Sequence, residues 1–251
     1  MKFKLKQEKL MYLLEKLLIK DMFPSSIIST KEGKLFSIQK EEHGRALRFL
    51  KVEKEFFDSI DDATETIEVD LSKVISIIKN VPAETELLVS TKGNKLSISG
   101  RDVDINISYK EPEGEVLQKL PIEFKEGVPH VGKSKVALTD KFFIKQESFK
   151  AISSYSGSLK TEFYKFLFDN GKIKVRVGDL HDTSDYAVLK LNGDISTGED
   201  LEVIFTYGMP QISDTFDSDV HVFAKTSNPA WFYESGKNHL LGILIPPYEP
   251  E

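Results

Sequence analysis

A short pattern that recurs four times constrains the fold of this chain more than any other feature. Each copy has an apolar run that alternates like a β-strand, a turn with Gly and Lys, and a second apolar run. Such a turn between two alternating runs is typical of a β-hairpin. A chain that repeats one small unit usually builds a symmetric structure. The four turns lie at Glu32–Leu35, Lys92–Leu96, Asn170–Ile173 and Ser235–Leu240.

The amino-acid composition limits the kinds of functional site that the chain can contain. The chain has 251 residues, of which 40% are hydrophobic, and it contains no cysteine. This excludes disulfides, thiolate metal sites and a cysteine nucleophile, and it fits a reducing compartment inside a cell. The stretch near Leu10–Ile19 is the longest apolar one, and Glu15 and Lys16 interrupt it. We therefore expect no segment that spans a membrane.

The chain divides into three parts. Residues 1–109 and 135–251 are each predicted to contain two helices and about eight strands, which makes the fold class α+β. Residues 110–134 are rich in Pro and Gly and are predicted to be extended, either as a passive connector or packed on a neighbouring surface through their apolar residues. The helices are expected at Glu8–Asp21, Asp70–Asn80, Ser148–Tyr155 and, weakened by Gly208 and Pro210, Tyr207–Thr215.

Three of these helices combine an apolar face with lysines elsewhere. In the first, Leu10, Leu14 and Leu17 share one face, and the spacing of the lysines places them on the opposite face. An ordinary solvated surface is the alternative interpretation for any single helix, but the same design in three helices favours a shared role. The lysines are Lys9, Lys16 and Lys20 in the first helix, Lys73 and Lys79 in the second and Lys150 in the third.

The order of elements resembles the DNA sliding clamps, which include proliferating cell nuclear antigen and the T-even phage processivity clamp. The resemblance covers essentially the whole chain. Leu18-Ile19-Lys20-Asp21 is similar to the end of the family's first inner helix, and Asp70–Lys79 is similar to its second inner helix. The segment 110–134 occupies the place of the connecting loop between domains. Asn238–Pro247 is similar to the final strand and the tail that follows it.

The resemblance implies a clamp fold of two similar domains and a ring of subunits. In that family the helices line the inner channel, and edge strands pair between subunits, most simply in a homotrimer. By position the pairing strands would be Val103–Tyr109 and Tyr186–Leu191. The interface residues would be Ile105, Ile107, Tyr109, Tyr186 and Val188.

The resemblance also implies a DNA polymerase processivity factor that encircles double-stranded DNA. Such a protein would be cytoplasmic or nucleoid-associated, or nuclear in a eukaryote. A ring of this kind contacts phosphates without reading bases, and the six helix lysines named above would line its channel. An acidic exterior over a basic channel would reconcile this role with the net charge of −6. The fourth helix departs from the family because Tyr207–Asp217 contains no basic residue.

The family binds DNA polymerase, the clamp loader and other replication or repair proteins through a short peptide. That peptide docks in an apolar pocket beneath the connecting loop. Core packing is the alternative interpretation for each apolar residue of the pocket, and for Ile243 it is the favoured one. Carried over by position, the pocket would contain Gln39, His43, Ala46, Leu120, Ile122, Pro229, Ile243, Ile245 and Pro246.

Two other classes of function stay open. An enzyme would need a nucleophile, a base or a cofactor loop, and the five histidines show no metal-ligand spacing. The Glu41-Glu42 and Asp61-Asp62 pairs are interpreted as solvated loop charges, so we expect no enzyme, metal or cofactor. A clamp-fold interaction protein, checkpoint-like or inhibitory, that does not support processive synthesis is the main alternative.

Overall fold

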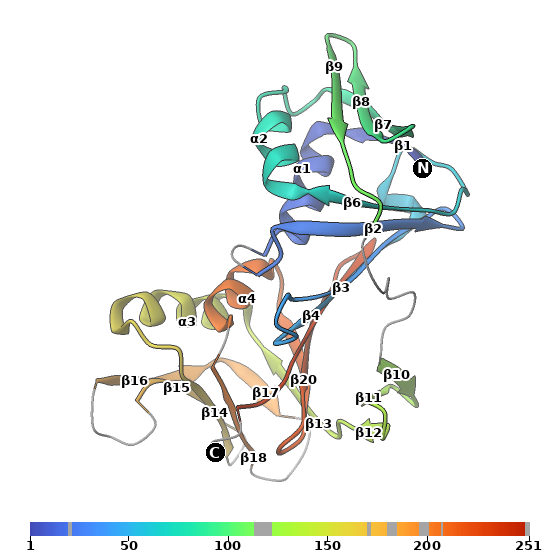
Figure 1. Ribbon diagram of the computed structural model, residues 1–251. Coiled ribbons are helices and arrows are strands. Elements are labelled where there is room, and N and C mark those ends of the chain that lie inside the picture. The colour runs from blue at the N-terminus through green and yellow to red at the C-terminus, as the bar shows by residue number, and fades with distance from the viewer. Residues whose placement is uncertain are drawn as a thin grey trace. The chain divides into compact units, whose positions relative to one another are not determined.

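The computed structural model describes residues 1–19, 22–112, 122–169, 172–179, 185–195, 201–206 and 208–248. The chain is α+β, with helices packed on antiparallel sheets, which confirms the predicted fold class. It forms two compact units (Figure 1). Unit 1 comprises Met1–Gln39, Arg48–Lys119 and Gly236–Leu241, and unit 2 comprises Lys40–Leu47, Leu120–Ser235 and Gly242–Glu251.

Unit 1 contains a five-stranded sheet in the order β5-β1-β7-β8-β9 and a second run of strands in the order β4-β3-β2-β6. The helices α1 and α2 lie side by side (Figure 1). The elements are β1 (Lys2–Lys6), α1 (Gln7–Leu17), β2 (Ser25–Lys31), β3 (Lys34–Lys40), β4 (Leu47–Val52), the 3-10 turn η1 (Lys54–Phe56), β5 (Ser59–Ile60), β6 (Glu65–Asp70), α2 (Leu71–Ile78), β7 (Glu86–Lys92), β8 (Lys95–Gly100) and β9 (Val103–Ser108).

Unit 2 contains a four-stranded sheet in the order β16-β15-β14-β18, the strands β17-β13-β19-β20, and a small sheet β10-β11-β12. The elements are β10 (Ile122–Lys125), β11 (Val128–Val131), β12 (Val136–Ala137), β13 (Asp140–Ile144), α3 (Gln146–Leu159), β14 (Tyr164–Asp169), β15 (Lys172–Gly178), β16 (Tyr186–Leu191), β17 (Gly193–Ile195), β18 (Leu201–Phe205), α4 (Met209–Thr215), β19 (Val220–Ala224) and β20 (Ala230–Ser235); β21 (His239–Ile245) belongs partly to each unit.

The predicted Gly-Lys turns are hairpins where the structure describes them. Lys31 pairs with Lys34 across the first turn, and Lys92 pairs with Lys95 across the second. In the first turn Glu32 and Gly33 both have positive φ, of 53° and 69°. Two successive residues in this region form the turn whose twist matches that of the flanking strands. The turn at Asn170-Gly171 lies outside the described residues.

The helix boundaries follow from capping and from packing. The side chain of Asp70 accepts a hydrogen bond of 2.9 Å from the backbone N–H of Lys73, so Asp70 is the predicted N-cap of α2. The helix α3 is longer than expected and buries Phe149, Ile152 and Ser156. The spacing of Phe149, Ile152 and Tyr155 predicts that all three are buried, but Tyr155 is 45% exposed.

Part of the predicted connector is folded. Strands β10 and β11 form a hairpin in which Lys125 pairs with Val128. Glu126 and Gly127 form its turn with φ values of 51° and 81°. Both strands are extended, as predicted, and the Glu-Gly pair supplies the left-handed turn that folds them into a tight hairpin. Phe124 on β10 is 52% exposed.

Aromatic side chains form the core of unit 2. Phe142 stacks on Phe168 with ring centroids 3.5 Å apart, and Phe232 lies 5.6 to 6.3 Å from three further phenylalanine rings. Gly242 is required beside this core, because a Cβ there would lie 2.0 Å from the indole of Trp231. Both residues are fully enclosed within unit 2.

A charged side chain lies in the core of unit 1. Arg48 on β4 has no exposed surface and donates hydrogen bonds to the hydroxyl oxygens of Ser26 and Ser37, at 2.8 and 2.9 Å, and to Gln39 Oε1 at 2.9 Å. It also donates to the carbonyl oxygen of Leu17 at the end of α1. Burial lowers the pKa of Arg48 to about 9, so the guanidinium is charged at neutral pH. One side chain thereby joins the end of α1 to three strands.

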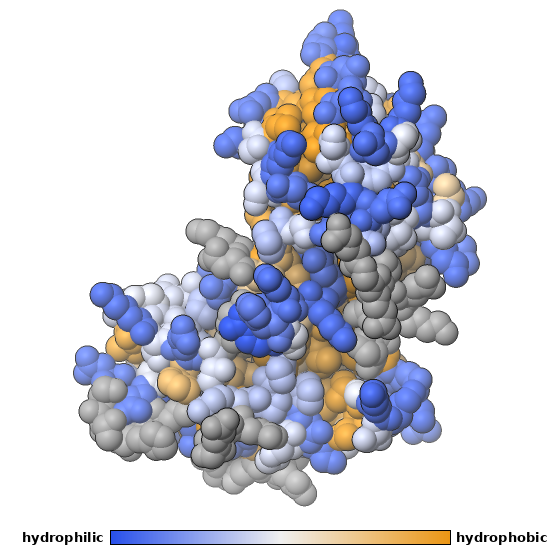
Figure 2. Space-filling model, in the orientation of Figure 1, coloured by the Kyte–Doolittle hydropathy of each residue, from blue (hydrophilic) through white to orange (hydrophobic). Residues whose placement is uncertain are grey.

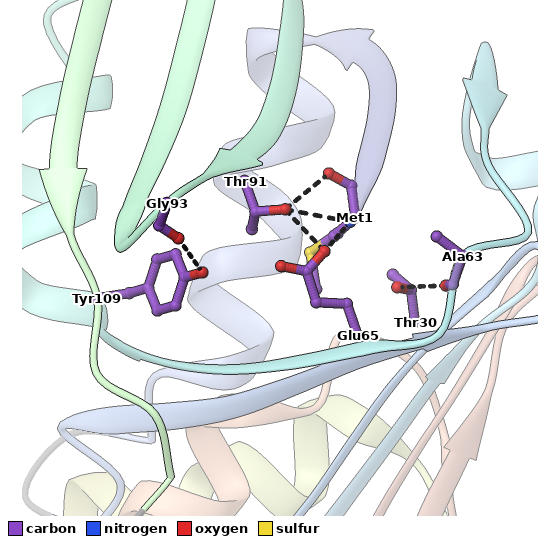
Figure 3. Close-up of polar contacts among 7 residues, drawn as sticks. All are labelled: Met1, Thr30, Ala63, Glu65, Thr91, Gly93 and Tyr109. Atoms are coloured by element: carbon purple, nitrogen blue, oxygen red, sulfur yellow. Dashed lines mark hydrogen bonds and ion pairs between the residues drawn. The ribbon is translucent and has the colours of Figure 1, made fainter.

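A second polar network joins β1, β6 and β7 of unit 1 (Figure 3). The amine of Met1 and the hydroxyl of Thr91 both donate to the carboxylate of Glu65, the latter at 2.7 Å. Burial raises the pKa of Glu65, but these two hydrogen bonds and the charge of the amine outweigh burial and leave the pKa below its ordinary value. The ionised carboxylate is thus the form that the folded chain favours.

We predict that Arg48→Ala lowers the free energy of unfolding by about 3 kcal/mol or more, because it removes the guanidinium that donates to the buried oxygens of Leu17, Ser26 and Ser37. Arg101→Ala, which removes an exposed arginine of the β8–β9 turn, is the control and should change stability by less than about 0.5 kcal/mol. Urea unfolding measures both. Equal effects of the two substitutions would contradict the role of Arg48.

We predict that Glu65→Gln destabilises the protein most near neutral pH. The folded pKa of Glu65 is lowered, so its contribution to stability is present above the ordinary pKa and is lost as pH falls through the folded value. The unfolding free energies of the parent protein and of the Glu65→Gln variant should therefore become more similar as the pH falls. Glu15→Gln, at an exposed position of α1, controls for the loss of one negative charge. A difference that does not depend on pH would refute the assignment.

Candidate functional site

The two strands expected to pair between subunits are both the terminal strands of their sheets. β9 follows β8 at one end of the five-stranded sheet, and β16 precedes β15 at one end of the four-stranded sheet. A terminal strand has unpaired N–H and C=O groups that can accept another strand. Figure 2 shows apolar side chains at the surface beside β9.

The five proposed interface residues differ in exposure. Tyr186 and Val188 on β16 are 47% and 50% exposed. Ile105 on β9 is half-buried, whereas Ile107 is enclosed in unit 1. Ile107 shares one face of β9 with Ile105 but has little exposed surface in the single subunit. Tyr109 is half-buried and donates a hydrogen bond of 2.7 Å from its hydroxyl to the Gly93 carbonyl (Figure 3).

The lysines of α1 do not form the exposed face that the sequence predicted. Lys9 Nζ donates to the carbonyl oxygen of Phe56 at 3.0 Å and lies 3.6 Å from the carboxylate of Asp58. Lys16 is buried, with its ammonium 5.5 Å from the centre of the Tyr12 ring. The prediction of a solvent-facing Lys16 is thus wrong, because its ammonium lies over the Tyr12 ring and not in solvent. Lys20 lies outside the described residues.

The exposed stripe of α1 carries acidic residues instead. Glu8 and Glu15 are exposed. Met11, which lies between them, and Leu18, which follows Glu15, are half-buried. These four positions follow the spacing of one helix face. The most exposed positions of α1 are therefore acidic, and Lys9, whose side chain is 38% exposed, is ion-paired with Asp58.

The other helices present basic charge unequally. Lys73 and Lys79 are exposed at the two ends of α2, and Lys150 on α3 is half-buried. The helix α4 has no basic residue, and Asp214 on it accepts a hydrogen bond of 2.8 Å from Ser153 Oγ on α3. Between its caps α2 has one lysine and no acidic residue, whereas α3 has Lys150 and Glu147 and is flanked by exposed lysines at both caps.

Most residues of the expected peptide pocket belong to unit 2, and many of them are buried. Ile243 has no exposed surface, as its core interpretation predicted. Gln39 belongs to unit 1, where its Oε1 accepts from Arg48. Leu120 lies outside the described residues. Among the remaining residues, Ala46, Ile122 and Ile245 are buried and Pro229 is half-buried. His43 and Pro246 are exposed.

One carboxylate organises the loop that carries His43. Glu41 is 5% exposed, and its Oε2 accepts from the backbone N–H groups of His43 and Arg45 at 2.9 and 3.2 Å. Its Oε1 accepts from the Arg45 guanidinium at 3.0 Å. Burial raises the pKa of Glu41, but the hydrogen bonds and charge of Arg45 and the bond from His43 outweigh it and lower the pKa.

The interpretation of Glu41 as a solvated loop charge was therefore wrong. The sequence offers one signal, an arginine four residues after the glutamate with Gly44 between them. Gly44 has a φ of 72°, which lets the loop turn back so that both backbone donors point at the carboxylate.

Within the described ranges, no group of three or more His, Cys, Asp or Glu residues could hold a metal ion. No helix described is long and apolar enough to cross a membrane. The polar run from Asp179 to Asp185 lies mostly outside the described residues.

Comparisons of the sequence with protein-family models and with curated proteins give no match. Comparison with solved structures finds proteins that match along the whole chain. The A. fulgidus proliferating cell nuclear antigen, in a structure with the C-terminal region of FEN-1 bound, is 15% identical, with a TM-score of 0.77 and coverage of 100% of this chain and 99% of that one. Proliferating cell nuclear antigen from Entamoeba histolytica is 11% identical, with a TM-score of 0.80 and coverage of 99% and 98%. The chain therefore has the fold of these sliding clamps along its whole length.

Proposed function

We propose that this protein is a sliding clamp, a ring that encircles duplex DNA and tethers DNA polymerase and other replication or repair proteins. The likeness of the whole chain to proliferating cell nuclear antigen carries the proposal. A clamp needs no catalytic group, because a closed ring is held on DNA by topology. Processivity follows when a polymerase is attached to that ring.

Ring closure would use the two terminal strands. In this proposal β9 of one subunit pairs with β16 of the next, and three copies close the ring. The position of both strands at sheet ends supports this arrangement. Tyr186 and Val188 would lose exposed apolar surface, which stabilises the contact by about 25 cal/mol for each Å² buried.

Contact with DNA would be carried chiefly by α2. Lys73 and Lys79 are exposed, and Lys150 on α3 adds a third cation. The glutamates on the exposed stripe of α1 would repel phosphate. We therefore propose that each subunit makes few phosphate contacts, which suits a ring that slides.

Partner proteins would bind unit 2 beside the loop that Glu41 organises. The A. fulgidus relative has the C-terminal region of FEN-1 bound, and a short peptide of a polymerase, clamp loader or nuclease is the corresponding ligand here. His43, Pro229 and Pro246 are the pocket residues with surface available to contact it.

A clamp-fold interaction protein without a role in processive synthesis is the second candidate. The acidic stripe of α1 and the absence of basic residues from α4 favour it. Product length on primed circular DNA, measured with a cognate polymerase and loader, separates the two. Longer products with the protein support the clamp, and unchanged products support the alternative.

We predict a particle near three times the 28.5 kDa subunit mass by light scattering. Val188→Glu should convert it to single subunits, because a charge would be buried where β16 meets its partner strand. Phe124→Glu, at an equally exposed apolar residue of β10, should leave the mass unchanged. A monomeric parent protein would argue against the ring.

We predict that Lys73→Glu combined with Lys79→Glu shortens the products of a processive polymerase while the trimer stays intact. The reversal replaces attraction to phosphate with repulsion. Lys92→Glu combined with Lys95→Glu, at the exposed β7–β8 hairpin, makes the same change in net charge and should leave product length unaltered. Equal loss in both variants would remove α2 from the DNA contact.

A further inference from the structure

The four-stranded sheet of unit 2 ends in a β-strand on each side. These terminal strands, β16 with 6 residues and β18 with 5, are similar in length (Figure 1). β18 is strongly apolar, because Leu201, Val203 and Phe205 are buried and Ile204 is half-buried. An apolar terminal strand invites pairing with a strand of another chain. Either end of this sheet could therefore accept the same incoming strand.

The tail segment that follows β21, residues 246–248, lies on the β18 edge. The backbone N–H of Tyr248 donates a hydrogen bond of 2.7 Å to the carbonyl oxygen of Ile204. The Tyr248 ring meets the ring of Phe163 edge-to-face, with the ring centroids 5.7 Å apart. Phe163, which directly precedes β14, is half-buried. One backbone contact and one side-chain contact thus hold the tail segment on this edge.

The tail segment is itself unsuited to accept a further strand. Pro246 and Pro247, the two residues before Tyr248, have no backbone N–H to donate. Proline and covering loops are the devices by which proteins keep terminal strands from pairing further. The tail segment therefore ends the sheet at β18 and does not extend it.

The opposite end of the sheet has no such cover in the part of the chain that the structure describes. There, no backbone group is hydrogen-bonded to the outer edge of β16. β16 is the strand that the proposed ring pairs with β9 of the next subunit. The tail segment thus distinguishes the edge proposed to close the ring from the edge that would have to stay unpaired.

We propose that the tail segment is a strap that closes the β18 edge and so restricts pairing between subunits to β16. Without the strap, β9 of another copy could pair with β18, and subunits would join outside the closed ring. The proposal rests on the proposed function in one respect, because it takes β9 and β16 as the ring contact. The covering of β18 does not depend on that contact.

The test measures mass in solution by light scattering over a range of protein concentrations. Tyr248→Pro removes both the N–H donor and the ring, so its mass at high concentration should exceed that of the parent about twofold or more. Tyr248→Phe retains the N–H and a ring, and as the matched control it should keep the parent mass. Ile204→Glu added to Tyr248→Pro should restore the parent mass, because a charge on a terminal strand opposes pairing and would lie opposite Lys165. Association caused by unfolding would not be reversed in this way.

Hydrogen exchange of the Tyr248 amide gives a second readout. This amide should exchange more slowly in the parent than in an unfolded peptide, and Phe163→Ala should speed its exchange about tenfold. The proposal is overturned if Tyr248→Pro has the parent mass at every concentration, or if the parent amide exchanges as fast as in an unfolded peptide. A parent protein that is a single subunit would contradict the ring alone. The strap then still predicts that Tyr248→Pro associates and that Ile204→Glu reverses the association.

Discussion

The buried guanidinium of Arg48 is the interaction on which unit 1 depends. Its acceptors come from β2, β3 and the last turn of α1, and all are neutral oxygens. The partial negative charge at the end of a helix helps to balance the cation. Because Arg48 holds the Leu17 carbonyl, it fixes the end of α1 and thus contributes to setting which side of this helix faces solvent.

Local signals in the sequence predicted much of the fold. The Gly-Lys turns gave hairpins because positive φ is a local property of Glu32-Gly33, and Asp70 capped α2 because its acceptor lies three residues away. The alternating residues of β9 and β16 predicted strands, although only the structure shows that both strands end their sheets. Whether a strand lies at the end of its sheet depends on how distant segments pair, and a single sequence does not show that pairing.

The errors arose where tertiary packing decides. Lys16 has the spacing of a surface residue but is buried, and Glu41 looks like a loop charge but is enclosed by its own loop. Tyr155 has the spacing of a core residue but faces outward. The expected division into an acidic exterior and basic helices also does not describe this chain, because the most exposed positions of α1 are acidic. A net charge gives the sum of charges and not their placement.

The central claim is that copies of the chain close around DNA, and topology tests it most directly. The protein would be loaded with a clamp loader and ATP onto nicked circular DNA, separated from free protein, and measured before and after a restriction enzyme linearises the DNA. The account predicts that the protein stays on the circle and is lost from the linear form by sliding off its ends. Equal retention on both forms, or none on the circle, would contradict it.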